Sequence, residues 1–241
     1  MCGRLNIIDD RFVQALMREM KVCNPAELQT GRFKMPTHDI SIVREVDGVR
    51  QLQTANWWLL QDATAEGFKP SRYTSFNSRF DKLNQKGSAS YLPYRHSRCV
   101  VVARGFGETQ KQQGKSRYFD FIAQDCAIAF AGLFRQWQHP HTGTLMTSCS
   151  IITLPPEPNL QPYHSKASPM ILPNDNQSLA AWLSPTNQSV SNFDSWLQPN
   201  LRHSFVGQEI TKPSEPMPLG SPFQLGDTQI PSQSHQQGRL F

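Results

Sequence analysis

Apolar residues recur at helical spacing near the start of the chain. In DDRFVQALMREM (residues 9–20) one helical face carries the apolar side chains, namely Phe12, Val13, Leu16, Met17 and Met20. Asp9 stands just ahead of this run, where a carboxylate suits the N-cap position. We therefore predict a helix over residues 9–20 with one buried side.

Short β-type runs follow one another through the middle of the chain. SIVREV and VRQLQTANWWLL (41–46 and 49–60) are separated by the turn pair Asp47–Gly48, which predicts a hairpin. Further runs cover 98–106, 117–122, 127–134 and 145–154, and two helices are predicted at 176–184 and 190–197. Strands come consecutively, without a helix after each. This pattern predicts an α+β single domain with a mostly antiparallel, barrel-like β core flanked by a few helices.

The composition changes near the C-terminal end. From about Gly207 onward Pro, Ser and Gln dominate the sequence. Such a composition is typical of irregular chain, because it offers few apolar residues to bury. We predict a folded domain over residues 1–210 and an irregular tail over 211–241.

Overall charge and apolar content narrow the class of protein. The 241 residues carry 24 Lys and Arg against 19 Asp and Glu, a formal charge of +5, which favours an anionic partner. No apolar run is long enough to cross a bilayer, and the start lacks the layout of a signal peptide. We expect a cytoplasmic protein, monomeric and without a membrane partner.

Five cysteines are spread along the chain, at Cys2, Cys23, Cys99, Cys126 and Cys149. Their number is odd, no two form a CxxC pair, and none has a histidine at zinc-finger spacing. We predict no disulfide framework, no metal site and no cofactor.

Cys2 differs from the other cysteines because removal of Met1 would give it a free α-amine as well as a thiol. The amine has an ordinary pKa of about 7.7–8.0 and the thiol about 8.5, so both are partly nucleophilic near neutrality. Such an amine condenses with an aldehyde, and the thiol then closes a thiazolidine. The alternative for any chain start is an inert, frayed terminus.

Residues 68–98 combine basic and aromatic side chains. Seven Lys and Arg, Lys82 and Arg98 among them, stand with one acid, Asp81, and are interleaved with aromatics that begin at Phe68. Basic groups follow phosphates and exposed aromatics stack on unpaired bases, a combination that suits single-stranded nucleic acid. A solvated basic loop whose aromatics pack inward explains the same composition.

Two further residues are candidates for proton transfer. Glu108 follows the β-run and two glycines of VVVARGFGETQ, and His164 opens HSKASPMIL. A carboxylate at a strand end and a histidine are common general acids and bases. An ordinary turn glutamate and a structural histidine are the alternatives.

Taken in order, several motifs resemble one family. These are MCGR, NSR with Asn77 and Arg79, RCVVVARGFGE ending at Glu108, AGLF, SCSIIT, and YHSK…PMIL around His164. Their order over residues 1 to about 210 is similar to the SRAP family, the SOS-response-associated peptidases also described as abasic-site processing proteins.

The resemblance implies a groove for single-stranded DNA that contains abasic sites and a covalent DNA–protein crosslink to the ring-opened sugar. Cys2 matches the position of the linkage, after loss of Met1, which a peptidase-like member would remove by autoproteolysis. Asn77 matches a residue that orients the linkage, Glu108 the acid–base carboxylate, and His164 a histidine tied to lesion sensing and reversal. Arg4 and Arg79 match phosphate contacts. A role at the nucleoid or replication fork is implied as well.

This chain departs from the family pattern mainly in its DNA-shaping residues. A GFYEW-like block is GFGET here, so Thr109 stands at a tryptophan position, and Phe68 is the only aromatic of DATAEGFKP. Lys166 takes the place of an arginine in HSKASP. We therefore include Phe68 and Lys166 among the candidate DNA contacts.

Two other function classes remain open on sequence grounds. An N-terminal-nucleophile cysteine peptidase or amidohydrolase would use Cys2 against a carbonyl and would need an oxyanion hole. A non-catalytic single-stranded-DNA-binding module would keep the groove without the chemistry.

Overall fold

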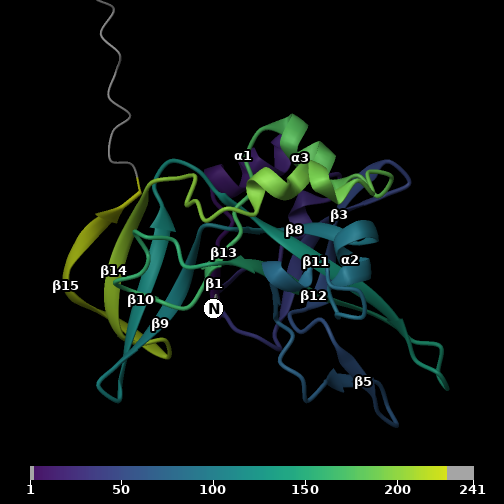
Figure 1. The fold of residues 1–241 in the computed structure, drawn as a ribbon, viewed down its shortest axis with the longest axis horizontal. Helices are drawn as coiled ribbons and strands as arrows, with labels where there is room; N and C mark the ends of the chain where they lie inside the picture. Colours follow the sequence, from purple (N-terminus) through teal and green to yellow (C-terminus); the bar gives the residue numbers. More distant parts are fainter. Residues whose placement is uncertain (1–2, 227–241) are drawn as a thin grey trace, which may run out of the picture.

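The computed structural model describes residues 3–226 of the chain. Its strands form two large sheets and one small hairpin (Figure 1). In that view α1 and α3 lie together at the top, and α2 lies lower, at the right. In Figure 1 one large sheet, called the first sheet below, lies at the right beneath α1 and α3. The other, called the second sheet, lies at the left and ends in β14 and β15. The α+β prediction is confirmed.

The first sheet closes into a five-stranded barrel. Its order is β11–β8–β3–β4–β12, and β11 also pairs with β12. The barrel strands are β3 (Asp39–Val46), β4 (Val49–Asn56), β8 (Arg98–Ala103), β11 (Ile128–Gln138) and β12 (Leu145–Leu154). All neighbours are antiparallel except β4 and β12, and two short strands, β7 (Asn77–Arg79) and β13 (Ser168–Pro169), are added to β12.

The turn between β3 and β4 matches its prediction. Asp47 and Gly48 have φ angles of 50° and 77°, the left-handed values that a two-residue hairpin turn of type I′ requires. Glycine takes such an angle without strain and aspartate tolerates it. The hairpin at residues 39–56 is therefore confirmed.

The second sheet has six strands in the order β15–β14–β10–β9–β1–β2. They are β1 (Arg4–Ile7), β2 (Gly31–Lys34), β9 (Gly105–Gln112), β10 (Lys115–Ala123), β14 (Phe205–Lys212) and β15 (Glu215–Leu225). A small hairpin of β5 (Gln61–Ala63) and β6 (Phe68–Pro70) projects at the lower right of Figure 1.

Helices occupy few of the described residues. They are α1 (Arg11–Glu19), α2 (Tyr91–His96), α3 (Asn176–Leu183) and the 3₁₀ turns η1 (Pro25–Glu27), η2 (Phe80–Lys82) and η3 (Val190–Trp196). The first helix is capped by Asp10, whose side chain accepts from the backbone N–H of Phe12 and Val13 at 3.0 Å, rather than by Asp9. The predicted helix at 190–197 is a 3₁₀ turn. Within residues 3–226 no helix is long and apolar enough to cross a membrane.

Strand alternation divides the core in two. Cys99, Val101 and Ala103 of β8 join a cluster shared with the six-stranded sheet. Val100 and Val102, between them, face α1 and α3. Both faces of β8 are therefore buried, which explains its uninterrupted apolar run.

The prediction of an irregular tail from about Gly207 is wrong as far as the structure describes the chain. Residues 205–225 form the β14–β15 hairpin at the edge of the second sheet. The prolines that suggested irregular chain, among them Pro216, Pro218 and Pro222, lie in β15, the outer strand. Edge strands tolerate proline because one of their sides makes no ladder hydrogen bonds.

β15 also supports the segment that carries His164. Phe223 stacks on Tyr163 with ring centroids 4.3 Å apart and planes 13° from parallel. Gly207 makes room for this contact, because a Cβ there would lie 2.3 Å from the Phe223 ring. The hairpin is thus part of the folded unit that holds the candidate site.

Candidate active site and nucleic-acid interface

Strand β9 presents different residues on its two faces. Phe106 lies in the core, so Glu108, two residues on, projects from the same face, while Gly107 and Thr109 belong to the opposite face. Arg4 of β1 pairs with Gly107 in antiparallel register. The start of the chain is thereby held beside Glu108.

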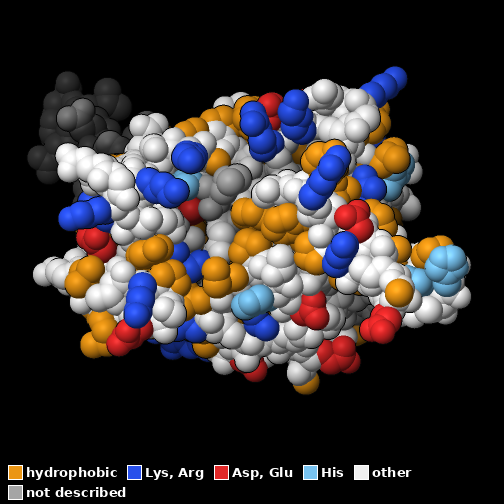
Figure 2. All heavy atoms as spheres, turned by 90° about the horizontal axis from the view of Figure 1, so that it is seen from below, with side chains coloured by type: hydrophobic (Ala, Val, Ile, Leu, Met, Phe, Trp, Pro, Cys, Tyr) orange, Lys and Arg blue, Asp and Glu red, His pale blue; other side chains and the backbone are white. Residues whose placement is uncertain are grey.

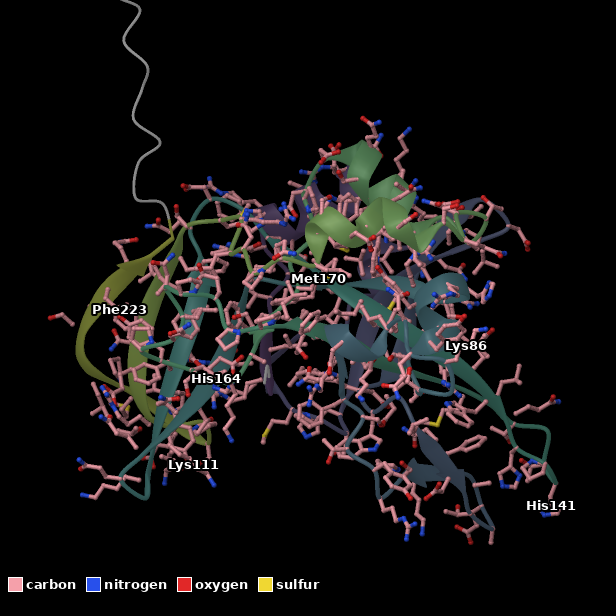
Figure 3. All side chains as sticks on the ribbon, viewed as in Figure 1. Lys86, Lys111, His141, His164, Met170 and Phe223 are labelled. Carbon is pink, nitrogen blue, oxygen red and sulfur yellow. The ribbon has the colours of Figure 1, made fainter. Side chains whose placement is uncertain are left out.

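The inner face of β9 carries an acid–base pair. Glu108 is 1% exposed and His164 is 5% exposed, and Oε2 of Glu108 lies 3.5 Å from Nδ1 of His164. The same Nδ1 lies 3.1 Å from the backbone carbonyl of Thr109. Because a carbonyl only accepts, the hydrogen bond to Thr109 requires the proton on Nδ1. Figure 3 shows His164 on the β9–β10 side of the molecule.

Burial moves the pKa values of this pair in opposite directions. Removal from water raises the pKa of Glu108 to about 7, although the positive charge of Arg4 opposes the shift. Burial lowers the pKa of His164 to about 4, and Lys166 lowers it further, while the Thr109 carbonyl acts in the opposite sense. At neutral pH the carboxyl is therefore close to half protonated and the imidazole is neutral. A carboxyl titrating near neutrality is suited to give and take protons.

The outer face of β9 holds Arg4. Its guanidinium donates to the carbonyls of Glu108 and Phe119 at 3.0 and 3.1 Å and to Oγ1 of Thr109 at 3.1 Å. It also lies 3.5 Å from the carboxylate of Asp120, which Arg32 approaches at the same distance. Arg4 is 4% exposed, and these contacts tie β1 to β9 and β10. Direct contact of Arg4 with a DNA phosphate stays a prediction.

A separate hollow collects three other predicted residues. Asn77, Arg79 and Lys82 line a cavity of about 330 Å³ against the barrel, and Tyr73 is also at its wall. Arg79 and Lys82 are exposed, and Arg79 forms a 2.9 Å ion pair with Asp81. Strand β7 fixes Asn77 by pairing it with Ile151 of β12. The basic groups here are open to an anionic ligand.

Arg98 does not belong to this surface. It is 4% exposed and donates to five backbone carbonyls, those of Tyr94, Arg95, Trp182, Ser184 and Asn187. Burial lowers its pKa to about 10, so it stays charged at neutral pH. Arg98 therefore joins α3 to the barrel, and we leave it out of the DNA interface.

The remaining predicted residues are dispersed. Cys2 lies outside the described residues. Lys166 is exposed two residues beyond His164, and Phe68 packs edge-on against His139 in the β5–β6 projection, with ring centroids 5.6 Å apart. Figure 2 shows the face seen from below, where Lys and Arg side chains are scattered, several of them in the upper half.

Sequence reasoning missed the outer-face residues Tyr118 and Asp120. They alternate with the core residues Phe119 and Phe121 in RYFDFI, so strand periodicity was the signal that pointed to a shared outer face. Residues 3–226 contain no cluster of three or more His, Cys, Asp or Glu arranged to hold a metal ion.

Comparison with known proteins finds several proteins whose sequences are similar to this chain. The abasic site processing protein YoaM of Bacillus subtilis is 30% identical over 204 residues, 83% of this chain and 86% of YoaM. The abasic site processing protein YoqW of the same organism is 32% identical over 129 residues, 53% of this chain and 55% of YoqW. The chain thus aligns with about half the length of YoqW. The abasic site processing protein HMCES of Xenopus tropicalis is 26% identical, with 58% of this chain and 47% of HMCES covered.

Solved structures share the fold. A crystal structure of a Bordetella bronchiseptica protein matches with a TM-score of 0.67 at 19% identity and covers 88% of this chain and all of the other, 100%. A Bacteroides thetaiotaomicron protein matches with the same TM-score of 0.67 and 19% identity, over 88% and 96% of the two chains. The family model described as SOS response associated peptidase (SRAP) matches residues 1–213. Because that match spans most of the sequence, this protein belongs to the SRAP family.

Proposed function

We propose that this protein processes abasic sites in single-stranded DNA by forming a covalent thiazolidine crosslink through Cys2. The observation that carries the proposal is the register of β1 on β9. Arg4 pairs with Gly107, and Gly3, the residue after Cys2, lines the same hollow as Glu108. An N-terminal nucleophile would therefore react beside a buried carboxyl whose pKa is about 7.

The reaction balances without a cofactor. The Cys2 α-amine adds to the C1′ aldehyde of the open sugar, and one water leaves as the imine forms. The thiol then adds across the C=N bond, its sulfur joining carbon and its proton going to nitrogen. Nothing is oxidised or reduced.

Glu108 and His164 take the proton-transfer roles in this scheme. The protonated carboxyl of Glu108 opens the sugar by giving a proton to the ring oxygen, and the resulting carboxylate takes the proton of the C1′ hydroxyl as the aldehyde forms. After the amine has added, Glu108 gives that proton to the carbinolamine hydroxyl, which leaves as water. His164 is neutral at pH 7 and keeps its Nδ1 proton on Thr109, so it orients the carboxyl without adding a charge. Asn77 would orient the linkage, and Arg79 and Lys82 would hold phosphates of the bound strand.

Incubation with an oligonucleotide that contains one abasic site tests the proposal. Wild-type protein should give a band that resists denaturation, and intact-mass analysis should show that Met1 has gone. Cys2→Ala should give no such band unless a reductant is added, because it keeps the amine but lacks the thiol that closes the ring. Cys2→Ser is the matched control, because it also keeps the amine and replaces only sulfur by oxygen, so it too should give only an imine that a reductant traps. Absence of a wild-type product, or an equal product from Cys2→Ala, overturns the proposal.

The same assay separates the other two function classes. A peptidase or amidohydrolase would turn over an acyl substrate even when abasic DNA competes for Cys2. A non-catalytic module would bind undamaged single strands in a salt-dependent manner and form no covalent product.

A further inference from the structure

A hollow that includes residues of the candidate site lies on the outer face of the six-stranded sheet. Its volume is about 810 Å³, within the ~300–1,000 Å³ common for small-molecule sites. Its walls come from β2, from β9 and β10, and from the turn between β14 and β15. It is lined by Gly3, Arg4, Arg32, Phe33, Met35, Gly107, Glu108, Thr109, Tyr118, Lys212, Pro213, Ser214 and Pro216.

Small residues of β9 make this space. A Cβ on Gly107 would lie 2.4 Å from Nε of Arg4, so the arginine lies flat over bare backbone. Thr109, the next outward residue, pairs with Tyr118 across the strands. The Arg4 guanidinium is 5.6 Å from the Tyr118 ring and 5.7 Å from the Phe33 ring. The floor is therefore a fixed cation with an aromatic ring to either side.

Cations stand at the rim. Arg32 and Lys212 are 58% and 55% exposed. Asp120 is shared between Arg4 and Arg32, so that group of three carries a net positive charge. Lys212 pairs with Glu215 at 3.0 Å in the exposed turn. An exposed pair of this kind is weak, so a phosphate can compete with Glu215 for the lysine.

We propose that this hollow binds one unpaired nucleotide that neighbours the abasic residue. The base lies against Phe33 and Tyr118, and its phosphate lies at Arg32 and Lys212. Aromatic walls suit the face of a base, and the basic rim suits the backbone. Gly3, the residue after Cys2, also lines the hollow, so a nucleotide held there would lie beside a sugar that reacts at the start of the chain. The assignment to a lesion neighbour rests on the proposed function.

The β14–β15 turn gives this subsite a wall beyond the family match. The family model ends at residue 213, whereas Ser214 and Pro216 also line the hollow. Two prolines at the turn, Pro213 and Pro216, limit its backbone freedom. The chain therefore adds a rigid wall opposite β2, and a base entering the hollow is enclosed from both sides.

Oligonucleotides with one reactive abasic site test the subsite. In two variants the neighbour on the 5′ or the 3′ side is replaced by a stable, unreactive baseless residue. With wild-type protein, one of these two changes should raise the half-saturating DNA concentration for crosslinking about 5- to 100-fold, the range of a lost base stack. The other change should have a smaller effect. If neither neighbour matters, the proposal is overturned.

Protein variants locate the effect. Tyr118→Ala should remove the dependence on the neighbouring base, and Tyr118→Phe should restore it, because stacking needs the ring and not the hydroxyl. Lys212→Ala should weaken binding and reduce its salt dependence. Lys111→Ala is the matched control, since Lys111 is also exposed, at the β9–β10 end labelled in Figure 3, but does not line the hollow. Equal losses in Lys111→Ala and Lys212→Ala, or a Tyr118→Ala protein that still distinguishes the neighbours, contradict the proposal.

A second readout separates failure of the subsite from failure of the crosslink. If wild-type protein forms no crosslink on any substrate, the proposed function fails, and the subsite is then read from fluorescence anisotropy with an undamaged single strand. Tyr118→Ala and Lys212→Ala should still weaken that binding while Lys111→Ala does not. Equal affinity of all four proteins overturns the subsite by itself.

Discussion

The two faces of strand β9 differ in how they treat buried charge. On the inner face Glu108 is 1% exposed and lies 3.5 Å from His164, and burial raises its pKa to about 7 although Arg4 opposes the shift. On the outer face Asp120 of the neighbouring strand β10, which pairs with Gly107, is also buried, at 4% exposure, but lies between Arg4 and Arg32. Burial raises the pKa of Asp120 as well, and both arginines oppose that change. One face therefore holds a carboxyl whose pKa lies near neutrality, and the other holds a group of paired charges.

The comparison teaches that strand alternation lets one short sequence serve two tasks. GFGET places Phe106 and Glu108 inward and Gly107 and Thr109 outward. The two faces stay coupled through Arg4, which donates to the Glu108 carbonyl and opposes the rise in the pKa of its carboxyl.

The largest expected effect comes from the inner face. Glu108→Gln removes the titratable proton but keeps the size of the side chain, so the rate of crosslink formation should fall about 10²- to 10⁴-fold. The measurement is single-turnover crosslinking on a denaturing gel. Glu66→Gln is the control, the same exchange at an exposed residue between β5 and β6, and should stay close to wild type. Equal losses in the two variants would mean that the loss does not come from the buried carboxyl.

The second effect belongs to the outer face. Arg4→Met removes the cation that lies between Asp120 and the carbonyls of Glu108 and Phe119, and breaking a buried ion pair leaves an uncompensated charge. We expect a loss of about 3 kcal/mol in the free energy of unfolding. Asp120→Asn in the same chain should recover part of the loss, which denaturant melts of the single and double variants can measure. A cost near zero for Arg4→Met would mean that the charges on this face do not hold β1 in place.

The pH dependence of stability sharpens the comparison further. The folded protein holds a proton on Glu108 up to about pH 7, whereas the unfolded chain releases it near the ordinary value of 4.5. Wild-type stability therefore declines as the pH rises between these values. Glu108→Gln lacks this decline, so its stability relative to wild type should be greater at pH 8 than at pH 5, by an amount of the order of 1–3 kcal/mol.

Thermal melts of Glu108→Gln and wild type at the two pH values test this difference. His164 has the opposite effect on the pH dependence of stability, in wild type and variant alike. Its lowered pKa reduces the free energy of unfolding as the pH falls from 6.5 toward 4. A difference that is the same at pH 5 and pH 8 would contradict a raised pKa for Glu108.

The smallest effect is expected where the Arg4 side chain of β1 lies over Gly107 of β9. Gly107→Ala places a methyl group 2.4 Å from Arg4 Nε, and the guanidinium, held by three hydrogen bonds, must shift. We expect a cost of about 1–2 kcal/mol from overpacking. Gly67→Ala is the control, since nothing lies within 4 Å of its added Cβ. Chemical denaturation compares the two, and equal stability of both variants would show that Arg4 moves freely.

Much of the fold could be predicted from patterns in the sequence. The Asp47–Gly48 turn and the apolar runs predicted the barrel strands, because each run alternates or is buried on both faces. The β14–β15 hairpin escaped prediction. Its prolines are incompatible with a central strand but acceptable at an edge, and composition does not tell which strand will be outermost.

The site was predictable in part. Order of motifs pointed to Glu108 and His164, which the structure brings within 3.5 Å of each other. In the basic and aromatic stretch at residues 68–98, by contrast, some of the side chains are buried in the folded protein and others are exposed. Tyr94 and Arg98 are buried, whereas Tyr73 is 61% exposed, and residue type alone does not distinguish them. Arg98 is held inside the protein by hydrogen bonds to five backbone carbonyls, and the sequence gives no sign of these contacts.

The prolines of β15 have a consequence for contacts between molecules. Met217 donates its N–H inward to Oγ1 of Thr211 at 3.2 Å, so the backbone nitrogens at positions 216 and 218 point away from β14. Both positions are proline and have no proton to donate. A strand from another chain that approached this edge would find carbonyls without the matching donors. The six-stranded sheet therefore ends in a border that resists edge-to-edge association and amyloid-like growth.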